Sequence, residues 1–417
     1  MPARIEPGQL AQFGIETCRV HDHPGLRDGG PELADEAGGV PGRALGEVVP
    51  LDQDHVGPAE PGEVIGDAAS GHSAADDDRA GFCGKLRHRY RPVTPGPDNR
   101  INGLKVDQKE PGMPDPVAGA MDLVTAWAGR PLTFTTIKGG LSHHIARVDS
   151  EDGDCWLLRV LDPRIAETGL GIPLDQEIAN TVAAASSGIG PRVVHVLPGV
   201  LLLEYVEGVT LDVPAVAARI EEVADACRRL HAGPRFGNDF SIFDKLREFV
   251  ARCRAHGLAL PAGYEDVLPA VAGIEAALAR RPFPTVPCHN DLLAENLIVT
   301  GDGVRIVDYQ LSGNNDPCFE LGDIAAESDF DPDQVVRLTR AYFGDDEHVP
   351  RVRLNLIMSN LTWTLWFVIH EGLVRHGALP GFDYSAEAAD KFAQAVRDLG
   401  DPRFGRLLDG VRKLRTS

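Results

Sequence analysis

The chain has 417 residues, of which 43% are hydrophobic and 25% charged, and its formal net charge is -21. This length leaves room for two or three domains with a sizeable core, and the composition is ordinary for a globular chain. The negative charge argues against nucleic acid or an anionic membrane surface as partner, whereas it suits attraction of a cationic small molecule.

Cysteine usage and the absence of sorting signals point to a reducing compartment. Seven cysteines are scattered through the chain without a CxxC pair, so we expect reduced thiols and a cytoplasmic location. No basic region followed by an apolar run opens the sequence, and the longest apolar runs have the length of a strand. We therefore expect neither a secretory signal nor a transmembrane span, while the oligomeric state stays open.

The first 112 residues differ from the rest of the chain. Glycine and proline make up about a quarter of them, and their apolar residues neither alternate nor recur at helical spacing. Composition of this kind predicts a disordered or non-native N-terminal extension. We place the natural start of the folded part at Met113 or Met121.

From Met121 the pattern becomes that of a β-rich region. Residues 132–162 read as three strands, separated by the turn Gly139-Gly140-Leu141-Ser142 and by an acidic glycine turn. Residues 172–191 read as a helix, and residues 192–196 and 200–211 as two further strands. The two glycines of the first turn would let backbone N–H groups approach a phosphate closely, with an ordinary hairpin turn as the alternative.

The second half of the chain has helical periodicity. Residues 216–233, 239–257 and 264–281 each carry apolar residues at helical spacing, and each segment ends at glycine or paired arginine. Residues 351–376 predict a long amphipathic helix, in which Trp363 and Trp366 lie three apart and therefore on one face.

Between these helices, residues 288–308 read CHNDLLAENLIVTGDGVRIVD and carry the clearest functional signal. His289, Asp291 and Asn296 precede an apolar hairpin with a Gly-Asp-Gly turn, and Asp308 follows it. This order is that of a phosphoryl-transfer loop followed by a metal-binding aspartate. Asp291 would meet the acceptor hydroxyl, and oxygens of Asn296 and Asp308 would hold Mg²⁺. The alternative is a polar loop between two core strands.

This segment, with its continuation YQLSGNNDPCFELGDIAAES, resembles the aminoglycoside phosphotransferase/choline kinase family, which is protein-kinase-like. The loop written H-N-D-L-x-x-x-N is most similar to that of the choline/ethanolamine kinase branch. The resemblance covers about residues 121–400. It implies an α+β, two-lobed fold, with a small antiparallel β lobe over residues 121–206 and a larger, mainly helical lobe over residues 207–417.

The resemblance also implies roles in ATP binding. Arg159 takes the position of the strand lysine of protein kinases and would hold phosphate oxygens, with Glu177 as its partner on the following helix. The turn at residues 139–142 would cover the triphosphate. Glu204 and Val206 would lie in the hinge between the lobes, where backbone groups meet adenine, and His289 would support the catalytic loop.

At the acceptor end, the resemblance implies a cation-binding pocket. Glu327 aligns with a carboxylate that faces the cationic head of the substrate in choline kinases. Trp363, Trp366 and Tyr384 correspond to aromatic residues that would surround such a head, because an aromatic face attracts a cation. Packing in a helical core is the alternative for both tryptophans. Leu311 departs from the pattern, because choline kinases often have tyrosine there.

These observations predict a small-molecule kinase that uses ATP and Mg²⁺. The acceptor that we expect is choline or ethanolamine, and an aminoglycoside or another sugar-like hydroxyl compound is the alternative. A nucleotide-binding pseudokinase that acts through protein contacts is the alternative of another class. The preference between ATP and GTP stays open.

Overall fold

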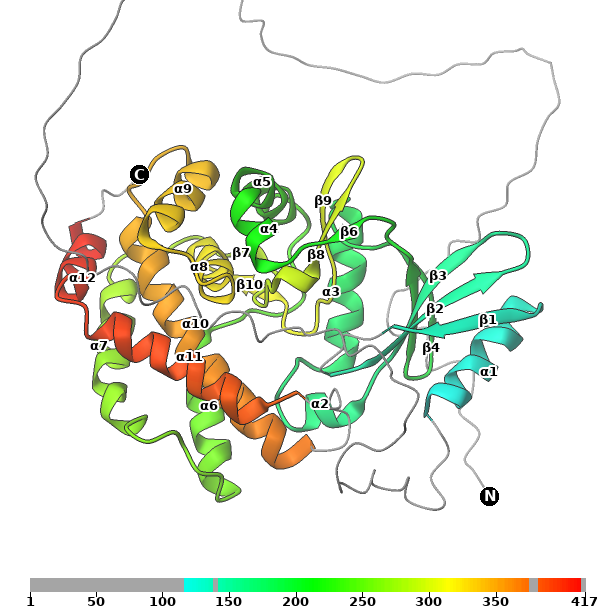
Figure 1. Ribbon diagram of the computed structural model, residues 1–417, viewed down its shortest axis with the longest axis horizontal. Coiled ribbons are helices and arrows are strands. Elements are labelled where there is room, and N and C mark those ends of the chain that lie inside the picture. Colours follow the sequence, from blue (N-terminus) through cyan, green and yellow to red (C-terminus); the bar gives the residue numbers. More distant parts are fainter. Residues whose placement is uncertain (1–115, 138–141, 375–381, 414–417) are drawn as a thin grey trace, which may run out of the picture. The chain divides into compact units, whose positions relative to one another are not determined.

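The computed structural model describes residues 116–137, 142–374 and 382–413 (Figure 1). All of these residues belong to one compact unit, Leu104–Ser417. The extension predicted for residues 1–112 lies outside the described residues, and so do Gly139, Gly140 and Leu141.

The N-terminal part of this unit is built on a five-stranded sheet. Its strands have the order β1-β2-β3-β5-β4, and each neighbouring pair is antiparallel. The bounds are β1 (Leu132–Thr136), β2 (His144–Ser150), β3 (Cys155–Val160), β4 (Val193–Leu197) and β5 (Val200–Glu204). The predicted antiparallel β lobe is therefore confirmed.

Helices cover both faces of this sheet, because successive side chains of a strand point to opposite faces. Leu158 and Leu202 pack with Val124 of α1 (Pro116–Ala128) on one face. Leu201 and Leu203 pack on the other face, towards α3 (Leu174–Ser186). We predicted one helix for this lobe; the structure adds α1 and the short α2 (Pro163–Glu167).

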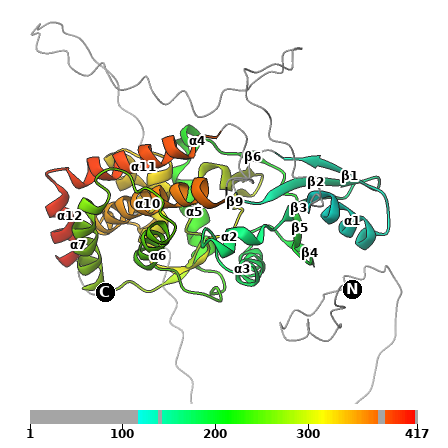
Figure 2. The same cartoon turned by 90° about the horizontal axis from the view of Figure 1, so that it is seen from below.

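The larger part of the unit is helical, as predicted, and lies to one side of the sheet (Figures 1 and 2). Its helices are α4 (Val213–Ala218), α5 (Ile220–His231), α6 (Ile242–Ala255), α7 (Leu268–Ala279), α8 (Pro317–Glu327), α9 (Pro332–Phe343), α10 (Val349–Ile369), α11 (Tyr384–Leu399) and α12 (Phe404–Lys413). Short 3-10 turns span Glu265–Val267 and Ala294–Asn296, and a π-helical turn, His370–Val374, follows α10.

A small β structure lies among these helices and carries the polar loop. Strand β8 (Leu297–Thr300) pairs with β9 (Gly303–Ile306) as the predicted hairpin, with β6 (Val209–Thr210) on its other side. Strand β7 (Val286–Cys288) pairs with β10 (Gly313–Asn315). Because the hairpin folds back on itself, the residues just before β8 and just after β9 come together.

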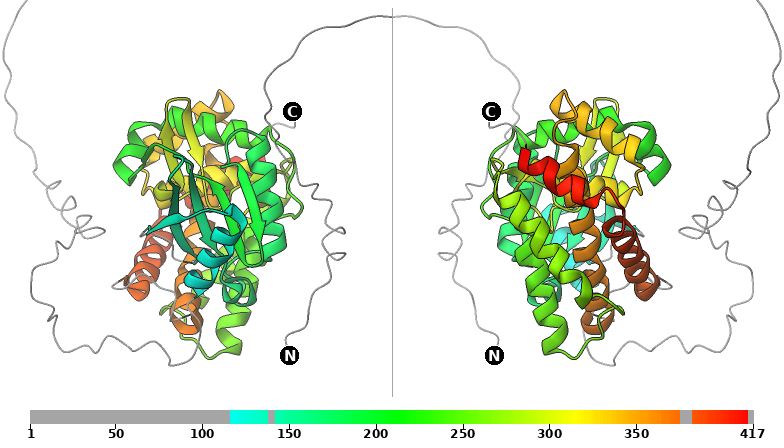
Figure 3. Two further views of the ribbon diagram at one scale, coloured as in Figure 1. Left: turned by 90° about the vertical axis from the view of Figure 1, so that its right-hand side faces the viewer. Right: turned by 90° about the vertical axis from the view of Figure 1, so that its left-hand side faces the viewer.

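Helix α10 differs from the amphipathic helix that the sequence predicts. It packs against α6, α8, α11 and α12 (Figure 3), and nearly all of its side chains are buried. A helix with neighbours on every side has no solvated face, which explains its weak periodicity. Among the described residues, one helix, Val349–Val374, is long and apolar enough to cross a membrane. However, 89% of its most apolar segment is buried inside the protein.

Candidate active site

Two carboxylates of α8 accept hydrogen bonds from the backbone of the polar loop that follows β7. Glu320 accepts hydrogen bonds from the backbone N–H groups of His289 and Asn290, both at 2.7 Å. Asp323, three residues later on α8, accepts one from Leu292 N at 2.8 Å. The residue between these anchored amides is Asp291, so α8 fixes the position of the carboxyl that we predicted to be catalytic.

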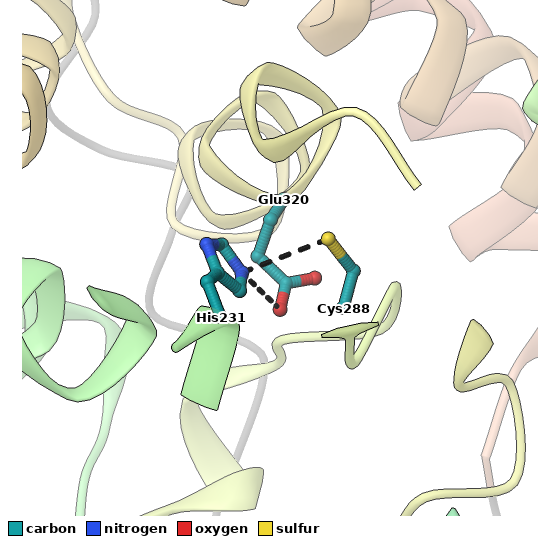
Figure 4. A group of neighbouring side chains, drawn as sticks. All are labelled: His231, Cys288 and Glu320. Atoms are coloured by element: carbon teal, nitrogen blue, oxygen red, sulfur yellow. Dashed lines mark hydrogen bonds and ion pairs between the residues drawn. The ribbon is translucent and has the colours of Figure 1, made fainter. Parts of the chain in front are cut away.

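A buried cluster that includes His231 and Cys288 holds Glu320 in place (Figure 4). His231, at the end of α5, places Nε2 3.4 Å from Glu320 Oε1 and 3.6 Å from the Cys288 thiol. Its Nδ1 lies 2.6 Å from the hydroxyl of Tyr342 on α9. The group combines residue types that bind metals, but Glu320 already accepts two backbone hydrogen bonds and both imidazole nitrogens have protein neighbours. We interpret it as a brace.

The brace keeps Glu320 ionised. Burial alone would raise its pKa, but the hydrogen bond to His231 and the charge of nearby imidazoles hold the pKa below its ordinary value. An ionised carboxylate accepts backbone N–H groups more strongly than a neutral acid does. The catalytic loop is therefore held by a charged anchor in a dry environment.

Asp291, Asn296 and Asp308 lie together in the folded chain. The side-chain amide of Asn296 donates to Asp291 O at 2.9 Å, and Val307 N donates to Asn296 O at 3.0 Å. His289 Nε2 lies 2.9 Å from Val307 O and so links the two ends of the hairpin. Asp308 has a φ of 71°, a left-handed conformation that costs energy for a non-glycine residue and is common at functional sites.

The pKa values of the Asp291 and Asp308 carboxyl groups are shifted in opposite directions. Burial raises the pKa of Asp291 well above its ordinary value, and the nearby carboxylates of Asp323 and Glu327 raise it further. Burial acts on Asp308 too, but the Arg159 guanidinium holds the pKa of Asp308 below its ordinary value. One carboxyl is thus suited to take up a proton and the other to stay charged.

Arg159 of β3 joins the sheet to this site. Its Nη2 lies 2.5 Å from Asp308 Oδ1 and 3.1 Å from Oε1 of Glu177 on α3. His143 places Nε2 3.5 Å from Glu177 Oε2 and accepts a hydrogen bond from Asp162 N. Sequence reasoning missed His143 because a histidine in a turn carries no partner information.

The other described residues that we predicted for the nucleotide have neighbours within the protein. Ser142 accepts a hydrogen bond from Gln310 at 2.9 Å. Glu204, at the end of β5, accepts one from Arg192 N and pairs with Arg305 of β9 at 3.2 Å. Val206 is half-buried in the connection that follows β5. Roles of these residues towards a nucleotide remain predictions.

The residues that we predicted for the acceptor have partners within the protein. Trp363 donates its indole N–H to Asp323 Oδ1 at 2.7 Å, and Trp366 donates to Leu170 O at 2.9 Å. Tyr384 stacks on His370 with ring centroids 4.5 Å apart, and His370 in turn stacks on Trp366. The three predicted aromatic residues therefore line one buried stretch of α10 and α11.

Glu327 is paired with a residue that the sequence did not single out. Its Oε1 lies 2.5 Å from Lys391 Nζ of α11, and both side chains are only 3% exposed. In an amphipathic helix, a lysine is predicted to lie on the solvated face, so no signal in the sequence marks Lys391 as buried. Its burial becomes visible only when α11 is placed against α10.

The donor atoms around Asp308 fit a magnesium ion. The amide nitrogen of Asn296 is used by Asp291 O, so the amide oxygen is the atom that can face a ligand. Amide and carboxylate oxygens are hard donors, and Mg²⁺ prefers one or two such protein ligands together with phosphate oxygens. The donor types thus fit the prediction that Asn296 and Asp308 would hold it.

Comparison with known proteins gives consistent similarities. Residues 133–354, more than half of the chain, match the model of the phosphotransferase enzyme family. A solved structure of a choline/ethanolamine kinase family protein from Mesorhizobium loti is 32% identical, with a TM-score of 0.60, and the match covers 72% of this chain and 99% of that one. Protein LicA of Haemophilus influenzae is 27% identical over 284 residues, 64% of this chain and 81% of LicA. A thiamine kinase of Salmonella paratyphi B is 27% identical over 157 residues, 37% of this chain and 53% of that kinase.

The anchoring by α8 predicts a stability effect that needs no substrate. In Glu320→Gln, one carboxylate oxygen becomes an NH₂ group that faces a backbone N–H, so the loop loses an acceptor. We expect unfolding free energy to fall by about 1–3 kcal/mol and the amides of His289 and Asn290 to exchange faster with deuterium. Urea denaturation and hydrogen exchange measure both effects.

The matched control is Glu222→Gln, which removes a carboxylate from an exposed i,i+3 pair with Arg219. This change should leave stability and loop exchange nearly unaltered. If Glu320→Gln behaves like the control, α8 does not hold the loop as described.

Proposed function

The chain belongs to the phosphotransferase enzyme family, and on this premise we propose that it transfers the γ-phosphoryl group of ATP to the hydroxyl of a small amino alcohol, with choline or ethanolamine as the leading acceptors. Family membership makes it a small-molecule kinase. The observation that carries the proposal is the proximity of Asp291 and Asn296, on the loop that α8 anchors, to Asp308 at the end of the β8–β9 hairpin. Arg159 lies beside Asp308.

In the proposed reaction, Asp291 orients the acceptor hydroxyl and receives its proton. Phosphoryl transfer of this kind needs positioning and charge neutralisation more than covalent chemistry. A carboxyl whose pKa is raised by burial is a better proton acceptor than an exposed aspartate. The anchored amides on either side of Asp291 prevent the loop from moving away from the acceptor.

At the nucleotide end, we assign Arg159 to the phosphate oxygens and Asn296 and Asp308 to Mg²⁺. Bound Mg²⁺ would supply neutralisation of the phosphate charge. Glu177 holds the guanidinium of Arg159 from the side of α3, so the arginine is positioned before a nucleotide arrives. Glu204 and Val206 remain our candidates for the adenine contact, and residues 139–142 for the cover of the triphosphate.

For the acceptor, the proposal of an amino alcohol rests on charge and on relatives. Asp323 and Glu327 place carboxylates beside Asp291, which favours a cation. The similar protein from Mesorhizobium loti bears the name of the choline/ethanolamine kinase family. An aminoglycoside also carries positive charge and stays the second candidate. A pseudokinase is disfavoured because base and metal ligands are all present.

Replacement of Asp308 tests the metal assignment. Asp308→Asn keeps the shape but removes the negative charge that Mg²⁺ and Arg159 share, so we expect ATP consumption in the presence of acceptor to fall by at least about 100-fold. Circular dichroism should remain that of the wild type. The control is Asp302→Asn in the exposed hairpin turn, and undiminished turnover of Asp308→Asn would exclude the assignment.

The aromatic residues are tested by comparing choline with its neutral carbon isostere, dimethylbutanol. Trp366→Leu removes an aromatic face, which we expect to raise the KM for choline by about tenfold, the loss of roughly 1–2 kcal/mol of cation–π attraction. The KM for the neutral isostere should change little. If the variant loses thermal stability while both KM values stay the same, Trp366 serves only core packing.

A further inference from the structure

The buried ion pair of Glu327 and Lys391 lies at the acceptor end of the site. Glu327 is the last residue of α8, one helical turn after Asp323, so both carboxylates project from the same face. Asp323 accepts a hydrogen bond from Leu292 N, directly after Asp291. Lys391 reaches this face from α11 and holds Glu327 Oε1 at 2.5 Å. A continuous series of contacts therefore joins the catalytic loop to Lys391.

Carboxylates outnumber cations in this part of the structure. Asp291 is half-buried, Asp323 and Glu327 are buried, and Lys391 is the ammonium group paired with Glu327. Burial and the charge of Glu327 raise the pKa of Asp323 to about 7, which reflects this crowding. Of these three acids, Lys391 neutralises one, Glu327.

Lys391 already neutralises one carboxylate, which limits the number of positive charges that an acceptor can carry into the site. An acceptor with one positive charge can approach Asp291 and still leave the pair of Glu327 and Lys391 intact. A second positive charge would need Glu327 as its counter-ion, and Lys391 would then remain buried without a partner. An unpaired buried charge is strongly unfavourable.

We propose that Lys391 is a specificity-determining residue: as a resident cation on Glu327, it selects acceptors that carry one positive charge over acceptors that carry two or more. This inference rests on the proposed function and deepens it. It separates the two acceptor classes that charge alone did not distinguish, because choline and ethanolamine carry one positive charge and aminoglycosides carry several.

The test compares ethanolamine with diaminopropanol, which offers a hydroxyl between two ammonium groups. The wild-type enzyme should have a kcat/KM for ethanolamine at least about tenfold above that for diaminopropanol. Lys391→Met removes the resident cation, and this ratio should shift towards diaminopropanol by about tenfold or more. Glu327→Gln combined with Lys391→Met removes both charges and restores the net charge, so the ratio should return towards the wild-type value.

The control is Arg254→Met, which removes a positive charge from an exposed ion pair with Glu265 and should leave the ratio unchanged. Lys391→Met leaves Glu327 unpaired, which lowers stability, so thermal denaturation accompanies the kinetics. The double variant leaves neither charge unpaired and is the folded comparison if the single variant fails to fold.

Calorimetric binding of both compounds to the wild-type protein gives the charge selection independently of turnover. Equal or tighter binding of diaminopropanol by the wild type, or an unchanged ratio in Lys391→Met, would overturn the role of Lys391 while the kinase proposal stands. Selective binding of ethanolamine without its phosphorylation would instead reject the proposed reaction and support charge selection by Lys391.

Discussion

The candidate site depends on the hydrogen bonds between α8 and the backbone of the catalytic loop. Glu320 and Asp323 accept hydrogen bonds from three backbone N–H groups of the loop, those of His289, Asn290 and Leu292. Buried amides need acceptors, and charged acceptors in a dry environment hold them strongly. The position of Asp291 is therefore set by a helix.

Helix α8 can serve as an anchor because it is itself fixed in the core. It packs against α10 so closely that a Cβ atom at Gly322 would lie 2.8 Å from Val352 O. The three acids of α8 have different partners: Glu320 and Asp323 accept hydrogen bonds from the loop, and Glu327 forms an ion pair with Lys391. Across the site, Arg159 neutralises Asp308. Each end thus pairs a carboxylate with one buried basic residue, and Asp291 lies between them with a raised pKa.

The sequence predicted the parts that depend on local spacing. His289, Asp291 and Asn296 occur within eight residues, and the following hairpin has a glycine turn, so their order predicted both the β8–β9 pairing and the position of Asp308. The strands of the β lobe were predicted from local strand and turn patterns, and their antiparallel arrangement from the family resemblance.

What the sequence did not predict depends on contacts between distant elements. Lys391 reads as a surface residue until α11 packs beside α10, and His143 acquires a role only through Glu177 of α3. The burial of α10 was not predicted, although weak periodicity is typical of a helix that other helices surround. Tertiary packing decides such features, and spacing along one segment carries no record of it.

The central claim is that Asn296 and Asp308 face one metal–nucleotide centre beside Asp291. Paramagnetic broadening by Mn²⁺, which occupies oxygen sites of this type, tests it most directly. On addition of Mn²⁺ and ATP, the side-chain amide signals of Asn296 should broaden strongly, whereas those of Asn360, buried in α10, should broaden far less. Unchanged Asn296 signals under conditions where ATP is bound would contradict the account.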